Sequence, residues 1–204
     1  EPQYDPTRPA PLTPDEPMPD TAGQHFLLYG TADLERVLDA MARQAAALLA
    51  GGPSPVVVGI LRRGAPLSER LHQRLVDQWA FTPMQRLQPK IQRYADDLRL
   101  LHPDTLLTED PAHAALDLAG RTVLLVDDVL YRGHSLLRAV EWLNRHQPAR
   151  IVVAVLADRD VGVLPVRADI VGLHLNVAPG DVVECRVPPY EDEFAIELFR
   201  PARD

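Results

Sequence analysis

Short runs of apolar, mostly β-branched residues alternate along the chain with stretches in which apolar residues recur at helical spacing. Residues 56–60, 123–126 and 150–157 form three such runs, and each suits a strand buried on both faces of a parallel sheet. Apolar residues at helical spacing follow in residues 67–75 and 136–140. Strands and helices in this alternating order predict an α/β fold whose central, mostly parallel sheet is flanked by helices.

The first helix is expected from Thr31 onward, with Thr31 as its N-cap and a Gly-Gly-Pro sequence at residues 51–53 as its end. One apolar face of this helix is formed by Leu34, Val37, Leu38, Met41, Ala45, Leu48 and Leu49. Further strands are expected near residues 170–174, 182–186 and 194–198. The last two are expected to be antiparallel.

The stretch from Thr122 to Val140 combines a buried strand, two adjacent acids and a glycine-containing turn before a helix. Asp127 and Asp128 follow the apolar run, and Gly133 lies in the turn. In an open α/β sheet this loop lies at the carboxyl edge, where ligands bind and where a helix N-terminus presents N–H groups to an anion. The pattern therefore suggests a sugar diol and a phosphate held side by side. The alternative is that the two aspartates are structural.

A second strand–loop–helix unit has two arginines at the same predicted edge of the sheet. Its loop reads Leu61-Arg62-Arg63-Gly64, and Pro66 suits the first turn of the helix that follows. Two neighbouring arginines are commonly a solvent-exposed pair. Their position directly after a buried strand favours contact with a ligand instead.

Three stretches depart from this regular pattern. Residues 1–24 are rich in proline and are expected to form an extended or disordered tail, with a partner-binding arm as the alternative. Residues 84–94 are a weaker strand prediction because Pro89 interrupts them. Residues 96–120 are polar and poor in helical pattern, which favours a mobile lid. A single domain is therefore expected over residues 25–204.

Composition narrows the function further. A formal net charge of -8 disfavours a general nucleic-acid binder, although it does not exclude a local basic face. Cys185 is the only cysteine, which excludes an internal disulfide and a thiolate cluster, and it is expected to be a small buried residue. No apolar run reaches the ~18 residues needed to span a bilayer, and no basic-then-apolar signal pattern opens the sequence. A cytoplasmic protein with no membrane contact is expected.

The run V-L-L-V-D-D-V-L-Y-R-G-H-S at residues 123–135 resembles the phosphoribosyl-pyrophosphate (PRPP) signature of type I phosphoribosyltransferases. Within that family its D-D-V-L-Y form is most similar to the PyrR group, bacterial pyrimidine-operon attenuators that also have uracil phosphoribosyltransferase activity. Further pieces agree in order and spacing at residues 58–67, 94–98, 155–159 and 164–172. The resemblance covers roughly residues 34–198. It implies the type I phosphoribosyltransferase fold, with a small C-terminal β hood.

The resemblance also implies PRPP as co-substrate and Mg²⁺ as cofactor. Asp127 and Asp128 would hold the ribose hydroxyls, directly or through the water shell of the metal, and with Arg63 they are the expected catalytic residues. The implied PRPP-binding residues are Arg62, Arg63, Gly64, Asp127, Asp128, Val129, Leu130, Tyr131, Arg132, Gly133, His134 and Ser135. Family members generally have Thr where Arg132 stands, and often Arg or Lys where His134 stands.

Tyr131, Asp158 and Arg159 are the implied base-binding residues. A tyrosine at position 131 resembles the pyrimidine-type members, because many purine enzymes carry an aspartate there, and Asp158-Arg159 matches a base-facing pair of the PyrR group. The residues after Arg159 depart from the PyrR pattern, which leaves the preferred base open. The implied lid residues are Tyr94, Asp96 and Asp97, and PyrR proteins usually have an arginine where this chain has Ala95.

The expected function is therefore the conversion of uracil and PRPP to UMP and pyrophosphate. The first alternative is a PyrR-like, non-enzymatic regulator that senses nucleotides and binds mRNA, and the second is a transferase for another base. Ala95 favours the regulator, whereas the acidic charge and the single lysine, Lys90, disfavour RNA binding. Because the family typically forms dimers or larger assemblies, a homo-oligomer is expected.

Overall fold

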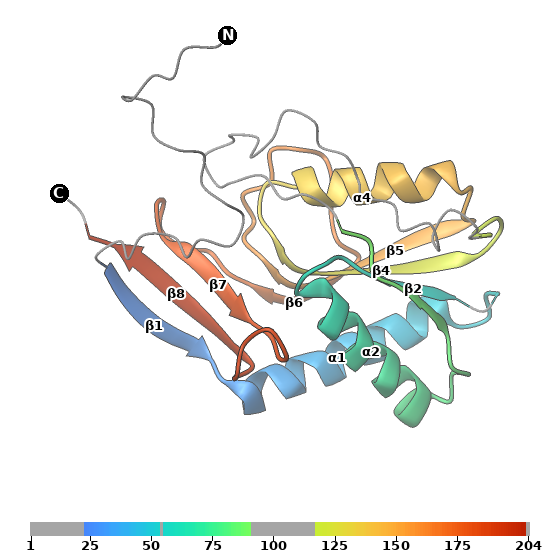
Figure 1. The fold of residues 1–204 in the computed structure, drawn as a ribbon, viewed down its shortest axis with the longest axis horizontal. Helices are drawn as coiled ribbons and strands as arrows, with labels where there is room; N and C mark the ends of the chain where they lie inside the picture. Colours follow the sequence, from blue (N-terminus) through green and yellow to red (C-terminus); the bar gives the residue numbers. More distant parts are fainter. Residues whose placement is uncertain (1–22, 54, 91–116, 203–204) are drawn as a thin grey trace, which may run out of the picture.

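The computed structural model describes residues 23–53, 55–90 and 117–202, which form two sheets with helices on both faces of the larger one (Figure 1). In chain order the elements are β1 (Gly23–Tyr29), α1 (Thr31–Leu49), β2 (Val56–Gly59), α2 (Gly64–Trp79), β3 (Gln85–Leu87), β4 (Thr122–Leu130), α4 (His134–Arg145), β5 (Arg150–Asp158), β6 (Ile170–His174), β7 (Val182–Arg186) and β8 (Ala195–Pro201). Residues 1–22 of the expected tail and the expected lid residues Tyr94, Asp96 and Asp97 lie outside the described residues.

The larger sheet has five strands in the order β3-β2-β4-β5-β6, and every neighbouring pair is parallel. The predicted parallel sheet is therefore confirmed. Strand β3 is only three residues long and lies within the weakly predicted segment 84–94. Strand order places β4 at the centre, so the acids of the predicted ligand loop lie in the middle of the carboxyl edge.

Alternate residues of the central strands pack into two separate cores. Val57, Leu124 and Val126 belong to the core that also contains the apolar faces of α1 and α2. Val123 and Leu125 belong to the core that is closed by α4. Helices α1 and α2 accordingly cover one face of the sheet and α4 covers the other (Figure 1). Burial on both faces is the reason that these strands are continuous apolar runs without polar alternation.

Strand β4 continues through the two acids, so the expected end of the strand at Val126 is wrong. Its pairing with β5 extends as far as Leu130, which lies opposite Asp158. The apolar run is interrupted at Asp127 and Asp128, which line a cavity at the sheet edge, whereas Leu130 returns to the core closed by α4. Backbone pairing thus holds Asp127 and Asp128 rigidly at that edge.

Thr31 begins helix α1 but is not its N-cap, which is Gly30 without a side-chain cap. The Thr31 hydroxyl instead donates a hydrogen bond of 2.9 Å to the carbonyl oxygen of Phe194. This bond ties the start of α1 to the loop before β8. The helix ends at Leu49, with Ala50 as its C-cap, one residue before the Gly-Gly-Pro sequence that was expected to end it.

The smaller sheet, here called the hood, is antiparallel and has the order β1-β8-β7. The antiparallel pairing of β7 with β8 confirms the prediction for these strands. Strand β1, which pairs along β8 from Gly23 onward, was not predicted. Ile196, Leu198 and Cys185 face the core under α1, and Cys185 is buried as expected.

Candidate active site

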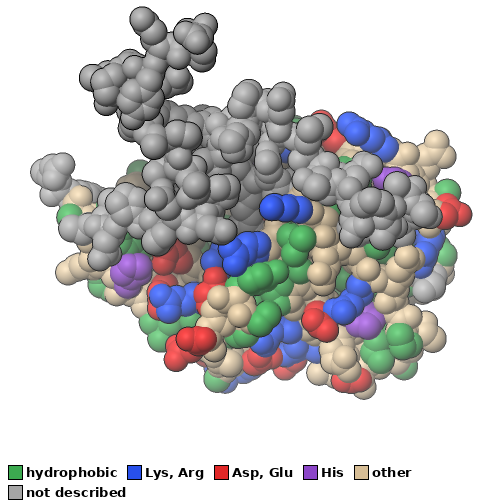
Figure 2. Space-filling view, viewed as in Figure 1, with side chains coloured by type: hydrophobic (Ala, Val, Ile, Leu, Met, Phe, Trp, Pro, Cys, Tyr) green, Lys and Arg blue, Asp and Glu red, His purple; other side chains and the backbone are tan. Residues whose placement is uncertain are grey.

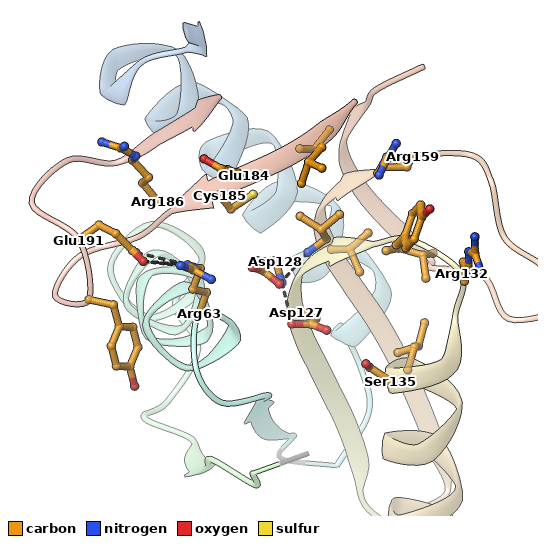
Figure 3. A pocket seen from close by; sticks show the side chains of 18 of the residues that line it. Arg63, Asp127, Asp128, Arg132, Ser135, Arg159, Glu184, Cys185, Arg186 and Glu191 are labelled. Carbon is orange, nitrogen blue, oxygen red and sulfur yellow. Dashed lines mark hydrogen bonds and ion pairs between the residues drawn. The ribbon is translucent and has the colours of Figure 1, made fainter. Parts of the chain in front are cut away.

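A cavity of about 970 Å³ opens at the carboxyl edge of the parallel sheet, between that edge and the hood. Segments that are far apart in the sequence line it: the end of β4, the start of α4, Arg63 before α2, Arg159 after β5, and the hood strand β7 with its following loop. Figure 3 shows charged side chains from these segments converging on one space. The edge that was predicted to bind a ligand is thus a walled cavity.

Asp127 and Asp128 lie at the floor of this cavity and are buried, with 5% and 2% of their surface exposed. The Asp127 carboxylate accepts the backbone N–H of Asp128 at 2.9 Å, and the Asp128 carboxylate accepts that of Val129 at 2.9 Å. Hydrogen bonds to the following N–H fix each side chain in orientation. A fixed pair of carboxylates at a cavity is suited to accept hydrogen bonds from a diol.

The same two carboxylates fit a magnesium ion by their chemistry, because Mg²⁺ takes oxygen ligands and is commonly bound through one or two carboxylates together with substrate phosphates. Two other groups among the described residues bring potential ligand atoms within 4.8 Å of one another: His25 with Glu184 and Glu197, and Asp158 with Asp160 and His174. Neither group includes an aspartate of the central pair.

The loop that follows β4 turns sharply into α4. Gly133 has φ +92°, a left-handed conformation that glycine adopts without strain, and it is the N-cap of the helix. The first hydrogen bond of this turn joins the Leu137 N–H to the Gly133 carbonyl at 2.9 Å. The N–H groups of His134, Ser135 and Leu136 precede this bond at the helix start, and all three residues line the cavity. This arrangement is suited to bind an anion.

Gly64 brings the start of α2 unusually close to β4. A Cβ atom at this position would lie 2.6 Å from the Val126 carbonyl oxygen and 3.2 Å from the Asp127 Cα. Only glycine therefore permits this approach. Its consequence is that the preceding residue, Arg63, reaches the same cavity as the two aspartates.

The Arg63 side chain forms a two-pronged ion pair with Glu191, which lies in the hood loop between β7 and β8 (Figure 3). Arg63 Nε donates to the two carboxylate oxygens at 3.1 and 3.3 Å, and a terminal nitrogen donates to one of them. Burial alone raises the pKa of Glu191, but hydrogen bonds from Arg63 and the Val187 N–H, with the charges of Arg63 and Arg62, outweigh it and hold the pKa below its ordinary value.

Tyr131, which also lines the cavity, has two guanidinium groups close to its ring. The Arg159 guanidinium carbon is 4.5 Å from the tyrosine ring centre, and that of Arg132 is 5.2 Å away. Arg159 is 8% exposed and donates a hydrogen bond of 3.0 Å to the Asp181 carbonyl. Its buried Nε has no hydrogen-bond partner among the described residues. A buried donor without a partner is costly, so a ligand acceptor at this point would be stabilising.

Most of the sequence-predicted site residues line the cavity: Arg63, Asp127, Asp128, Val129, Leu130, Tyr131, Arg132, Gly133, His134, Ser135 and Arg159. Three described residues do not. Gly64 lies beneath it against β4, Arg62 packs over the Tyr190 ring at 4.7 Å, and the Asp158 carboxylate accepts the Asp160 N–H at 2.8 Å. Asp158 thus stabilises the turn that follows β5.

The hood residues of the cavity were not predicted from the sequence. They include Glu184 and Arg186 of β7 and the acidic run Glu191-Asp192-Glu193. The run of three acids after two prolines was a visible signal. Its place beside Arg63 depends on how the hood packs over the sheet, which no local pattern in the sequence indicates.

Comparisons with known proteins agree with this geometry. A family model described as phosphoribosyl transferase domain matches residues 30–192. The bifunctional protein PyrR of Deinococcus radiodurans is 34% identical over 175 residues, which cover 85% of this chain and 94% of the relative. The protein of the same name from Roseiflexus sp. is 37% identical over 159 residues, covering 76% of this chain and 84% of the relative.

Solved structures show the same fold at lower identity. Trypanosoma cruzi hypoxanthine phosphoribosyltransferase in complex with IMP matches with a TM-score of 0.66 at 18% identity, covering 89% of this chain and 91% of that one. The Staphylococcus aureus enzyme of that name matches with a TM-score of 0.63 at 20% identity, covering 77% of this chain and 80% of that one.

None of the described helices is long and apolar enough to cross a membrane. The sequence motif, the cavity and the matched length together place this chain in the phosphoribosyl transferase domain family, with the type I fold.

Proposed function

We propose that this protein transfers the 5-phosphoribosyl group of PRPP to uracil, giving UMP and pyrophosphate. The observation that carries the proposal is the convergence of the buried Asp127–Asp128 pair, the N-terminus of α4 and Arg63 on one cavity. A diol-binding pair, a phosphate-binding helix start and a cation for the leaving group are the three elements that a PRPP site requires. The bond from ribose C1 to the pyrophosphate oxygen breaks, and a bond from C1 to a uracil ring nitrogen forms as that nitrogen loses its proton.

In this proposal the ribose is held by the carboxylates of Asp127 and Asp128. Their hydrogen bonds to the following backbone N–H groups keep them oriented before substrate arrives. Positive charge develops on the ribose as the C1–oxygen bond lengthens, and nearby fixed carboxylates stabilise that charge. The 5′-phosphate is held by backbone N–H groups at the start of α4, where Arg132 adds a positive side chain.

The pyrophosphate group is assigned to the opposite side of the cavity, next to Arg63. A guanidinium is suited to phosphate oxygens because its donors match two oxygens at once. Mg²⁺, which Asp127 and Asp128 would hold directly or through water, would neutralise charge on the departing pyrophosphate. Arg63 stabilises the same group from the side of α2.

Uracil is assigned to the neighbourhood of Tyr131 and Arg159. The unpartnered Nε of Arg159 offers a hydrogen bond to a carbonyl oxygen, and uracil has two. Support also comes from the PyrR relatives at 34–37% identity, since the resemblance to the PyrR group implies uracil phosphoribosyltransferase activity. The hypoxanthine enzymes, at 18–20% identity, support the fold alone. We further propose a cytoplasmic location, and a homo-oligomer as the resemblance to type I phosphoribosyltransferases implies.

A scan of free bases with PRPP and Mg²⁺, in which pyrophosphate release is measured, tests the proposed function. Uracil is expected to give the fastest release, and hypoxanthine, guanine and adenine to give at least ~10²-fold less, as mismatched polar groups do in a site built for specific hydrogen bonds. Faster pyrophosphate release with a purine than with uracil would identify that purine as the preferred substrate. No release with any base would contradict the enzymatic function and favour the regulator.

A further inference from the structure

Both arginines of the loop before α2 are held by consecutive residues of the hood loop. Arg62 packs over the Tyr190 ring at 4.7 Å, and Arg63 is paired with Glu191. The partners of the Arg63 ion pair are 128 residues apart in the sequence. The hood loop therefore fixes the position of the neighbouring loop before α2, whose Arg63 lines the same cavity.

Glu191 is itself anchored, which makes it a firm support. One carboxylate oxygen accepts the Val187 N–H at 2.7 Å, and the carboxylate receives Nε and one terminal nitrogen of Arg63. A two-pronged arginine–carboxylate pair fixes the plane of the guanidinium as well as its position. Since a guanidinium carries five N–H donors, this pairing orients the remaining edge of Arg63.

We infer that Glu191 is a positioning residue that holds Arg63 in the orientation needed to bind the pyrophosphate group. This inference rests on the proposed function for the identity of the anion. It predicts that loss of the Glu191 carboxylate weakens pyrophosphate binding, although it removes a negative charge from the cavity. Electrostatic repulsion alone predicts the opposite sign, because pyrophosphate is an anion and the cavity also contains Glu184, Asp192 and Glu193.

The test is a double-mutant cycle with wild type, Glu191→Gln, Arg63→Ala and the double variant, in which calorimetry measures binding of inorganic pyrophosphate with Mg²⁺. Glutamine keeps an oxygen for the Val187 N–H, so the hood loop retains its anchor. Glu193→Gln is the matched control, because it removes the same charge from the same loop, where Glu193 forms no ion pair among the described residues.

Glu191→Gln is expected to weaken pyrophosphate binding about tenfold in the wild-type background and to have no further effect in the Arg63→Ala background. Glu193→Gln is expected to leave binding unchanged or slightly tighter. Tighter binding by Glu191→Gln, or an equal loss in both backgrounds, would overturn the positioning role. The double-mutant cycle measures pyrophosphate binding and the base scan measures turnover, so the two proposals can fail separately. If Glu191 and Arg63 are coupled but no base gives turnover, the proposed transferase function is contradicted and the role of Glu191 stands. If turnover is observed but the two residues are not coupled, only the role of Glu191 is contradicted.

Discussion

At the scale of single residues, Asp127 and Asp128 at the sheet edge contribute their charge rather than apolar packing. Asp127 and Asp128 are buried acids in a cavity, and an acid is almost never buried unless its charge is used or compensated. Their location at the carboxyl edge of the sheet could be predicted from the sequence, because two acids directly after an apolar run are visible locally. The sequence was not sufficient to predict Glu191, whose partner Arg63 is 128 positions away.

Asp128→Asn is expected to lower turnover by at least ~10²-fold, a loss comparable to the removal of one preorganised electrostatic contact. Asparagine keeps an oxygen for the Val129 N–H, so the melting temperature is expected to change little. Steady-state kinetics and thermal unfolding of the same preparation measure both effects. Asp77→Asn, on the exposed surface of α2, is the control and is expected to retain full activity. A large loss of stability with unchanged activity per folded molecule would indicate a structural aspartate.

At the scale of elements, the sequence predicts the helices and strands that have a clear local pattern of apolar residues. Strands β2, β4 and β5 and helix α2 were predicted because their apolar runs and helical spacing are strong. Strand β1 was missed because its residues are mostly exposed and lack period-two burial, and it is stabilised by pairing with β8 at the other end of the described chain. The prediction of Thr31 as the N-cap was wrong because its hydroxyl donates a hydrogen bond to the carbonyl oxygen of Phe194, which is distant in the sequence.

Gly64→Ala is expected to destabilise the protein by about 1–3 kcal/mol, the usual cost of overpacking, because its Cβ would lie 2.6 Å from the Val126 carbonyl oxygen. Activity is expected to fall as well, since α2 must move away from β4. Urea unfolding measures the stability. Gly30→Ala is the control, because no atom lies within 4 Å of its added Cβ, and a loss below about 1 kcal/mol is expected for this N-cap. Equal stability of the two variants would argue against the close approach.

His72 links α2 to the start of β3 in a pH-dependent way. Its Nε2 accepts the Met84 N–H at 3.0 Å, which requires a neutral ring. Burial and the charge of Arg86 lower the pKa of His72, against the opposing effect of Glu69. Because the folded pKa is below the unfolded value of about 6.5, the unfolded state binds more protons between the two. The stabilisation is therefore present above pH 6.5 and is lost as the pH falls through the folded pKa.

His72→Leu removes the acceptor for the Met84 N–H and is expected to cost about 1 kcal/mol at pH 7.5. The stability gap between wild type and His72→Leu is expected to narrow as the pH falls from 7.5 to 5. Urea unfolding at several pH values measures this gap. A gap that stays constant over the whole range would show that the protonation of His72 is not coupled to folding.

For the whole molecule, the balance of acidic and basic residues favours the enzyme over an RNA-binding regulator. The chain has 29 acidic and 21 basic residues, and on the face shown in Figure 2 the Lys and Arg side chains are interspersed with Asp and Glu. Phosphate contacts supply most of the non-specific affinity for nucleic acid, so a mixed surface of this kind disfavours RNA. The same expectation follows from the composition of the sequence alone.

Weak RNA binding is accordingly expected, with a dissociation constant above about 1 μM at physiological salt, in the range typical of non-specific binding. A gel-shift titration with the leader RNA of the pyrimidine genes, in the presence and absence of UMP, measures it. An unrelated RNA of equal length is the control and is expected to bind equally weakly. Submicromolar binding that UMP strengthens would make the regulator the better description of this protein.

The measurement that tests the central claim most directly is a calorimetric titration of PRPP into the protein with and without Mg²⁺. The convergence of the aspartate pair, the helix start and Arg63 predicts saturable, magnesium-dependent binding to wild type that is greatly weakened in Asp128→Asn. An absence of magnesium-dependent heat at millimolar PRPP would contradict the assignment of this cavity as a PRPP site.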